Sequence, residues 1–191
     1  MGQYYRPILG DNSGLNCKVF DRSVDDEYTL AKLMEHSWWL NPFCNSFAEK
    51  IFKRKGRVIW CGDYAEDEDF DFKLDYAVYV PNEKEIWGET VKLYKSKSTD
   101  FTLDNKFLLN HDKKEFIDLD EYKSKSKDKD GWIIHPLPLL TAVGNDKGSG
   151  DFHEGNIGYE FVGSWAWNLI SISDKVPKNF KKFDVIFKEI L

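Results

Sequence analysis

The sequence predicts an α+β fold, with a mainly antiparallel sheet built from hairpins and about three helices. Short runs of alternating apolar and polar residues come mostly in pairs, and turn-forming residues separate the members of each pair. Apolar residues at helical spacing occur in fewer stretches. Because strands follow strands directly along the chain, hairpins are favoured over βαβ units.

The first predicted elements are a hairpin and a helix. Residues 4–9 and 16–20 alternate in polarity and flank the turn-forming run 10–14. Over residues 29–38, apolar side chains recur at helical spacing, so a helix is expected there.

The clearest helix signal is Asn41 followed by Pro42, since an Asn N-cap and a proline in the first turn both favour a helix start. Its expected buried face consists of Phe43, Cys44, Phe47, Ala48, Ile51 and Phe52. The basic residues that follow and Gly56 predict the end of the helix. An aromatic stripe of this kind is typical of a core rather than of a ligand site.

The rest of the chain is predicted to be mostly strands and loops. Strands are expected at 57–61, 76–80 and 132–134, and as hairpins at 106–109 with 115–119 and 159–162 with 165–172. Residues 86–94 fit either a strand or a helix. The remaining expectations are a polar loop at 120–131, an extended segment at 135–138, a long Gly-rich loop at 144–158 and a C-terminal helix after Pro177.

Length and composition indicate one globular domain spanning residues 1–191. The chain has 191 residues, 16% of them aromatic, and no stretch rich enough in Pro or Gly to act as a linker. No apolar run approaches the roughly 18 residues that span a bilayer, and no secretory signal is evident. Three widely spaced cysteines without a C-x-x-C motif are typical of free thiols in a reducing cytoplasm. A cytoplasmic protein is therefore expected.

The charge distribution suggests what kind of partner this chain would bind. The formal net charge is −6, which argues against direct nucleic-acid binding because that needs a clustered basic face. Residues 63–75 alone contain seven acids and one Lys, with aromatic residues among them. Such a segment suits contact with a partner that has a basic surface. The candidate binding residues are Asp63, Tyr64, Glu66, Asp67, Glu68, Asp69 and Phe70.

The Gly-rich loop at 144–158 is the second candidate site. Asp146, Asp151 and His153 carry the oxygen and imidazole ligands that a divalent metal could use, although the same composition is typical of a surface loop. His135 and His153 are the candidate catalytic residues, since imidazole titrates near neutral pH. No cofactor motif is present, so no cofactor is expected.

Several segments together resemble a group of short bacterial and bacteriophage proteins that open with Met-Gly-Gln-Tyr-Tyr. The segments that carry this resemblance are residues 1–5, 32–36, 57–64, 110–114, 134–140, 144–151 and 163–166. They span most of the chain, which implies one continuous fold. Asp146, Lys147 and Ser149 depart from the Gly- and Arg-richer pattern of that group, which argues against anion binding by the loop. The resemblance carries over no catalytic residue and implies an accessory role such as interference with host machinery.

Two functional hypotheses follow from these observations. The first is a small interaction protein, encoded by a phage or prophage, that binds a host protein and modulates or inhibits it in an anti-defence role. Its support is the acidic segment, the lack of a catalytic signature and the resemblance. The second is a small-ligand- or metal-binding enzyme that uses the 144–158 loop with His135. The first is favoured, because only the loop supports the second.

Overall fold

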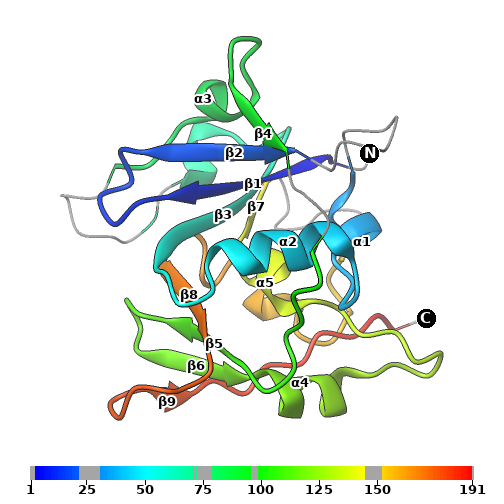
Figure 1. The fold of residues 1–191 in the computed structure, drawn as a ribbon. Coiled ribbons are helices and arrows are strands. Elements are labelled where there is room, and N and C mark those ends of the chain that lie inside the picture. Colours follow the sequence, from blue (N-terminus) through cyan, green and yellow to red (C-terminus); the bar gives the residue numbers. More distant parts are fainter. Residues whose placement is uncertain are drawn as a thin grey trace.

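The computed structural model describes residues 3–21, 31–70, 72, 79–95, 99–144 and 152–190. All nine strands found in these ranges belong to one sheet (Figure 1). The strands are β1 (Tyr5–Gly10), β2 (Cys17–Asp21), β3 (Gly56–Gly62), β4 (Leu93–Lys95), β5 (Phe107–Asn110), β6 (Glu115–Asp118), β7 (Ala142–Val143), β8 (Leu169–Ser173) and β9 (Lys181–Lys182). The helices are α1 (Leu33–His36), α2 (Pro42–Lys50), α3 (Glu83–Trp87), α4 (Leu119–Ser126) and α5 (Pro136–Leu140), with short 3-10 turns η1 (Asp67–Phe70) and η2 (Tyr159–Phe161).

The sheet is mixed: five of the pairings between described strands are antiparallel, in line with the expectation of a mainly antiparallel sheet, and three are parallel. Its order is β4-β2-β1-β3-β8-β5-β6-β9, and β7 pairs with β3 beside this path. The pairs β2–β4, β3–β7 and β6–β9 are parallel, and the other pairings are antiparallel. Parallel neighbours need long connections. Here the chain leaves the sheet, forms helices and returns to it. Turn residues between adjacent strands do not predict such long connections.

Two of the predicted hairpins are confirmed. β1 pairs antiparallel with β2, with Ile8 opposite Val19, around the predicted turn at 10–14. β5 pairs antiparallel with β6, with Leu108 opposite Ile117. In both cases the turn residues and the alternation of the flanking runs agree, so local sequence alone determines the register.

Strand β3 is the centre of the molecule, and all seven of its residues are buried. Its side chains alternate between two apolar clusters. Val58 and Trp60 belong to the larger one, which includes α2 and α5, whereas Ile59 and Cys61 belong to a smaller one with Phe70. The β1–β3 region is therefore covered on both faces, by α2 on one side and by the segment around η1 on the other.

Helix α2 begins as predicted. The Asn41 side chain accepts hydrogen bonds from the backbone N–H groups of Phe43 and Cys44, at 2.9 and 3.3 Å. Phe47 is fully buried and meets Trp60 edge to face, with 4.8 Å between ring centroids. The predicted end is wrong, because the helix stops at Lys50 and Gly56 already begins β3.

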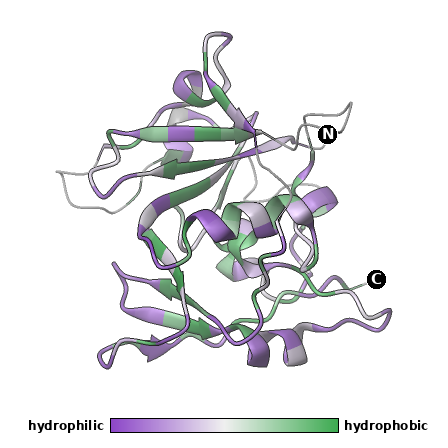
Figure 2. Cartoon of the chain, in the orientation of Figure 1, coloured by the Kyte–Doolittle hydropathy of each residue, from purple (hydrophilic) through white to green (hydrophobic). Residues whose placement is uncertain are grey.

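Helix α4 lies where a polar loop was expected. The Asp118 side chain accepts from the N–H groups of Asp120 and Glu121, both at 3.1 Å, and so caps the helix. Tyr122 is buried and donates to the carbonyl oxygen of Ile134 at 2.9 Å. The cap and the buried residues Leu119 and Tyr122 thus order a segment that is mostly polar, as the purple colour along α4 shows (Figure 2).

Three further expectations are wrong in the C-terminal half. Residues 135–138 form the cap and first turn of α5 rather than an extended segment, because Pro136 suits the first helical position. No strand forms at 132–134, where Ile134 makes a single bridge to Trp38. Residues 159–167 form η2 and turns instead of a hairpin. Of the two strands expected there, only the second forms, as β8.

The two other helix expectations are also corrected. The C-terminal segment has no helix among residues 178–190 and contains the short strand β9. Its buried Phe187 packs edge to face on Phe152, and this contact does not require helical spacing. Of the helix expected over 29–38, the described residues form only α1. Residues 22–30 lie outside the described ranges, and so do most of the expected strand 76–80 and most of the Gly-rich loop.

Within the described ranges, no helix is both long enough and apolar enough to cross a membrane. The three cysteines are free thiols, as expected. Cys44 and Cys61 are buried, and Cys17 is half-buried. Burial raises the pKa of the Cys17 thiol to about 11, so it stays protonated and unreactive near neutral pH.

Candidate binding site

The acidic segment folds into the 3-10 turn η1 beside the end of β3. The Asp69 carboxylate accepts a hydrogen bond from the N–H of Glu66 at 2.8 Å and so fixes the turn. Phe70 anchors the turn, because its side chain is buried in the smaller apolar cluster. Phe70 packs edge to face against Phe72, with 6.2 Å between ring centroids. Phe70 is therefore a structural anchor, not an exposed contact residue.

Three carboxylates in η1 and directly before it face solvent. Glu66, Glu68 and Asp69 are exposed, and none of them forms an ion pair with a residue that the structure describes. The Tyr64 side chain is 49% exposed next to them. Asp63 is half-buried and accepts from the N–H of Tyr4 at 3.0 Å. The described part of the segment thus presents negative charge that no described cation neutralises, together with the accessible ring of Tyr64.

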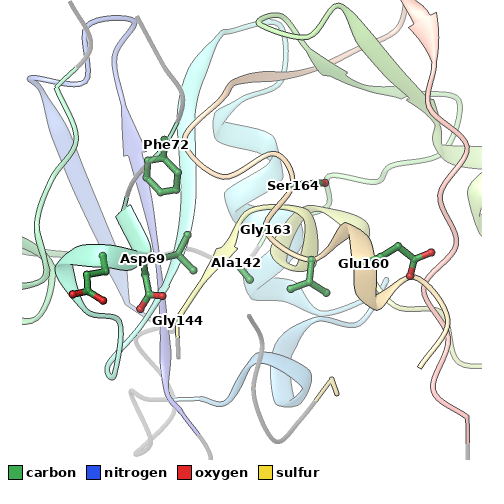
Figure 3. A pocket seen from close by; sticks show the side chains of 10 residues that line it. Asp69, Phe72, Ala142, Gly144, Glu160, Gly163 and Ser164 are labelled. Atoms are coloured by element: carbon green, nitrogen blue, oxygen red, sulfur yellow. The ribbon is translucent and has the colours of Figure 1, made fainter. Parts of the chain in front are cut away.

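A cavity of about 400 Å³ opens beside this turn (Figure 3). We call it the acidic pocket. Carboxylates of η1 lie at one side, the end of β7 forms the floor, and the segment around η2 forms the opposite side. Its lining residues are Glu68, Asp69, Phe72, Ala142, Val143, Gly144, Glu160, Val162, Gly163 and Ser164.

Two glycines allow the backbone segments to close around this pocket. Gly163 has φ +73°, and a Cβ there would lie 2.6 Å from the carbonyl oxygen of Ala142. A Cβ on Gly144 would lie 2.4 Å from Oε1 of Gln3. The N–H of Gly163 also donates to the carbonyl oxygen of Leu139 at 2.8 Å, which holds the turn against α5. A side chain at Gly163 would push this turn away from Ala142 on the facing wall, whereas one at Gly144 would displace the Gln3 side chain outside the pocket.

Ser164 is one of the polar residues that line the pocket. Its carbonyl oxygen accepts from Nζ of Lys113 at 2.8 Å. Its Oγ is buried and has no hydrogen-bond partner among the described residues. Because this atom is buried, a ligand in the pocket would not reach it in this conformation.

The structure does not bring the residues of the second candidate site together. His153 is exposed, and its Nδ1 lies 2.8 Å from the carbonyl oxygen of Glu154. Asp146 and Asp151 lie outside the described ranges. Among the residues that are described, no three His, Cys, Asp or Glu side chains converge as a metal site requires.

His135 serves as the N-cap of α5. Its Nδ1 accepts from the N–H of Leu137 at 3.2 Å, which places the ring proton on Nε2. The ring is buried, and this burial lowers the pKa of His135 to about 3. His135 caps this helix as a neutral imidazole, and it is not among the residues that line the acidic pocket. This location gives no support to proton transfer by His135.

One His–Ser pair was not anticipated from the sequence. Nε2 of His111 lies 2.7 Å from Oγ of Ser171, because β5 and β8 are neighbours in the sheet. Burial is the main cause that lowers the pKa of His111 to about 4, so the ring is a weak base at neutral pH. Asp112 does not complete a triad, since its Oδ2 accepts from Arg57 and from the N–H of Leu169.

A second cavity was also missed, and we call it the tryptophan pocket. Its volume is about 370 Å³, and its lining residues are Trp38, Trp39, Leu40, Asn41, Lys123, Gly131, Trp132 and Ile133. Leu40 is 81% exposed and Trp132 is 59% exposed. The bridge between Trp38 and Ile134 brings these segments together. The consecutive apolar residues 38–40, directly before a helix cap, are the signal that could have indicated this surface.

Comparisons with protein-family models, with curated proteins and with solved structures found no match to this chain.

Proposed function

We propose that this chain is an interaction protein that binds a partner with a basic surface and contacts it through the turn η1. The observation that carries this proposal is that Glu66, Glu68 and Asp69 are exposed and form no ion pair with a described residue. Unpaired carboxylates in one turn produce a local negative potential that favours a cationic partner.

The remaining residues of the turn support the same function. Tyr64 offers an exposed aromatic ring, and aromatic side chains are frequent anchors in protein interfaces. Phe70 and the Asp69 cap hold the backbone of the turn in place before binding. A preformed contact surface loses less conformational entropy on association than a flexible one.

The biological role that we propose is modulation or inhibition of a host protein. Its basis is the resemblance to short bacterial and bacteriophage proteins, together with the acidic surface. The carboxylates would attract a basic partner only at close approach, because the screening length is about 8 Å at physiological ionic strength.

The test is the association rate of a fluorescent lysine-rich peptide, measured by stopped flow against ionic strength. The variant is Glu66→Lys/Glu68→Lys, which leaves the Asp69 cap in place. The matched control is Glu49→Lys/Glu89→Lys, which reverses two exposed acids elsewhere that also form no ion pair with a described residue. At low salt we expect the variant to associate about tenfold more slowly, with a flatter salt dependence.

The control should keep most of the wild-type rate, because its charges lie elsewhere on the surface. Equal losses in the variant and the control would contradict the proposal, since net charge alone would then govern association. Unchanged rates in the η1 variant would also contradict it.

A further inference from the structure

We propose that the acidic pocket receives a single lysine or arginine side chain of the partner. This inference rests on the proposed function, and it adds a defined subsite to a general electrostatic surface. The pocket combines carboxylates, an aliphatic wall and an aromatic ring within one cavity of about 400 Å³. Each of these matches one part of a long cationic side chain.

The aliphatic stem of such a side chain would pack on the floor of the pocket. Ala142, which lies between Asp69 and Glu160 in Figure 3, supplies apolar surface there, and Val143 and Val162 also line the pocket. Lysine and arginine place their methylene groups on apolar surface while the charged end remains in a polar environment. A small hydrophilic cation such as a metal ion would gain nothing from these walls.

The charged end would reach the carboxylates of Glu68 and Asp69. In Figure 3 Asp69 lies at one end of the pocket and Glu160 at the other, and Glu68, the neighbour of Asp69 in the chain, also lines the pocket. Asp69 uses Oδ2 for the backbone of Glu66, and its other oxygen can accept from a ligand. Hydrogen bonds between a cation and a carboxylate are about twice as strong as neutral ones.

The Phe72 ring also favours a cation in this pocket. It lies on the same side of the pocket as Asp69 (Figure 3), and a cation near the face of an aromatic ring is attracted to it.

The alternative ligands fit less well. A divalent metal ion needs several converging ligands, and no group of three is found among the described His, Cys, Asp and Glu side chains. An apolar side chain would leave the carboxylates without a partner. The tryptophan pocket, whose lining has no Asp or Glu, is the more suitable site for an apolar group.

The experiment compares four small probes by NMR titration of the full chain. The probes are the Nα-acetyl methylamides of lysine, arginine, norleucine and citrulline. Norleucine and citrulline keep the length of the two cationic side chains but lack their charge. We expect the lysine or arginine probe to shift the amide signals of residues 142–144 and 162–164, and the neutral probes to leave them unchanged.

The variant is Glu68→Gln/Asp69→Asn, which removes both charges and keeps an oxygen that can cap Glu66. The matched control is Glu66→Gln, because Glu66 lies directly before η1 but does not line the pocket. We expect at least about tenfold weaker binding of the cationic probe in the double variant, as loss of charged hydrogen bonds implies. The control should bind like wild type.

Equal binding of lysine and norleucine, or unchanged binding in the double variant, would overturn the pocket proposal. So would the absence of pocket shifts with every probe. These results would not overturn the proposed function, which is tested by the association rate of the Glu66→Lys/Glu68→Lys variant. If the Glu66→Lys/Glu68→Lys variant associated at the wild-type rate while cationic probes still bound in the pocket, the proposed attraction of a basic partner by η1 would be refuted and the pocket proposal would stand.

Discussion

Nε1 of Trp60 donates a hydrogen bond of 2.7 Å to Nε2 of His36 inside the core. Both residues are fully buried, and their rings are stacked with 6.0 Å between centroids. Because the two residues come from β3 and α1, this bond ties the central strand to the first helix. It also explains how the core accommodates a buried imidazole nitrogen, since a buried acceptor needs a donor.

Replacing Trp60 with Phe should lower the free energy of unfolding by about 2–4 kcal/mol. The substitution leaves Nε2 of His36 without this donor and also removes part of a fully buried ring. Urea denaturation measures the change. Trp132→Phe is the matched control and should stay within about 0.5 kcal/mol, because Trp132 is exposed. A loss under about 1 kcal/mol for Trp60→Phe would contradict a stabilising role of the bond.

Phe47→Ala should cost about 3–5 kcal/mol of stability. Phe47 is fully buried and packs edge to face against both Trp60 and Phe20, so its removal leaves a cavity between α2 and the sheet. Leu40→Ala provides the comparison, since Leu40 is an exposed apolar residue near the start of the same helix. If both substitutions had similarly small effects on thermal and urea unfolding, the packing of α2 on the sheet would be in doubt.

Stability should fall as the pH decreases below about 6.5, because His135 is buried as a neutral ring. Its folded pKa is lowered to about 3, whereas the unfolded chain binds a proton near the ordinary value of about 6.5. Between these values the unfolded state holds more protons, so the stabilisation is complete above pH 6.5 and decreases toward pH 3. At pH 5 the expected loss from this one group is about 2 kcal/mol.

Urea denaturation at pH 7 and pH 5 tests this linkage in the wild type and in His135→Asn. Asn is a suitable replacement because its side chain can also cap α5. The variant should lose less stability than the wild type between the two pH values. The same pH dependence in both proteins would show that another group is responsible.

Local signals predicted only those elements that local residues determine. The Asn41–Pro42 helix start and the β1–β2 and β5–β6 hairpins depend on adjacent cap and turn residues. Helix α4 was missed although the Asp118 cap is a local signal, because most of the segment is polar and its anchor is the contact of Tyr122 with Ile134, outside the helix. The C-terminal segment differs from the expected helix because the half-buried Phe183 and the buried Phe187 pack on partners distant in the sequence, Phe161 and Phe152.

The candidate site shows the same limit. Charge alone pointed to the acidic turn, and the exposure of Glu66, Glu68 and Asp69 is a property of that local segment. The pocket beside it requires β7 to pair with β3 and the segment around Gly163 to lie against Ala142. These are contacts between residues far apart in the chain. Periodicity and turn chemistry carry no information about them.

The central claim is that the contact surface consists of η1 and the acidic pocket. It is tested most directly by titrating the isotopically labelled chain with a lysine-rich peptide and mapping the amide shifts. We expect the largest shifts at residues 66–69, 142–144 and 162–164, and their decrease with added salt. Shifts of equal size near Glu49 and Glu89, or shifts centred on Trp132 and Leu40, would contradict the claim.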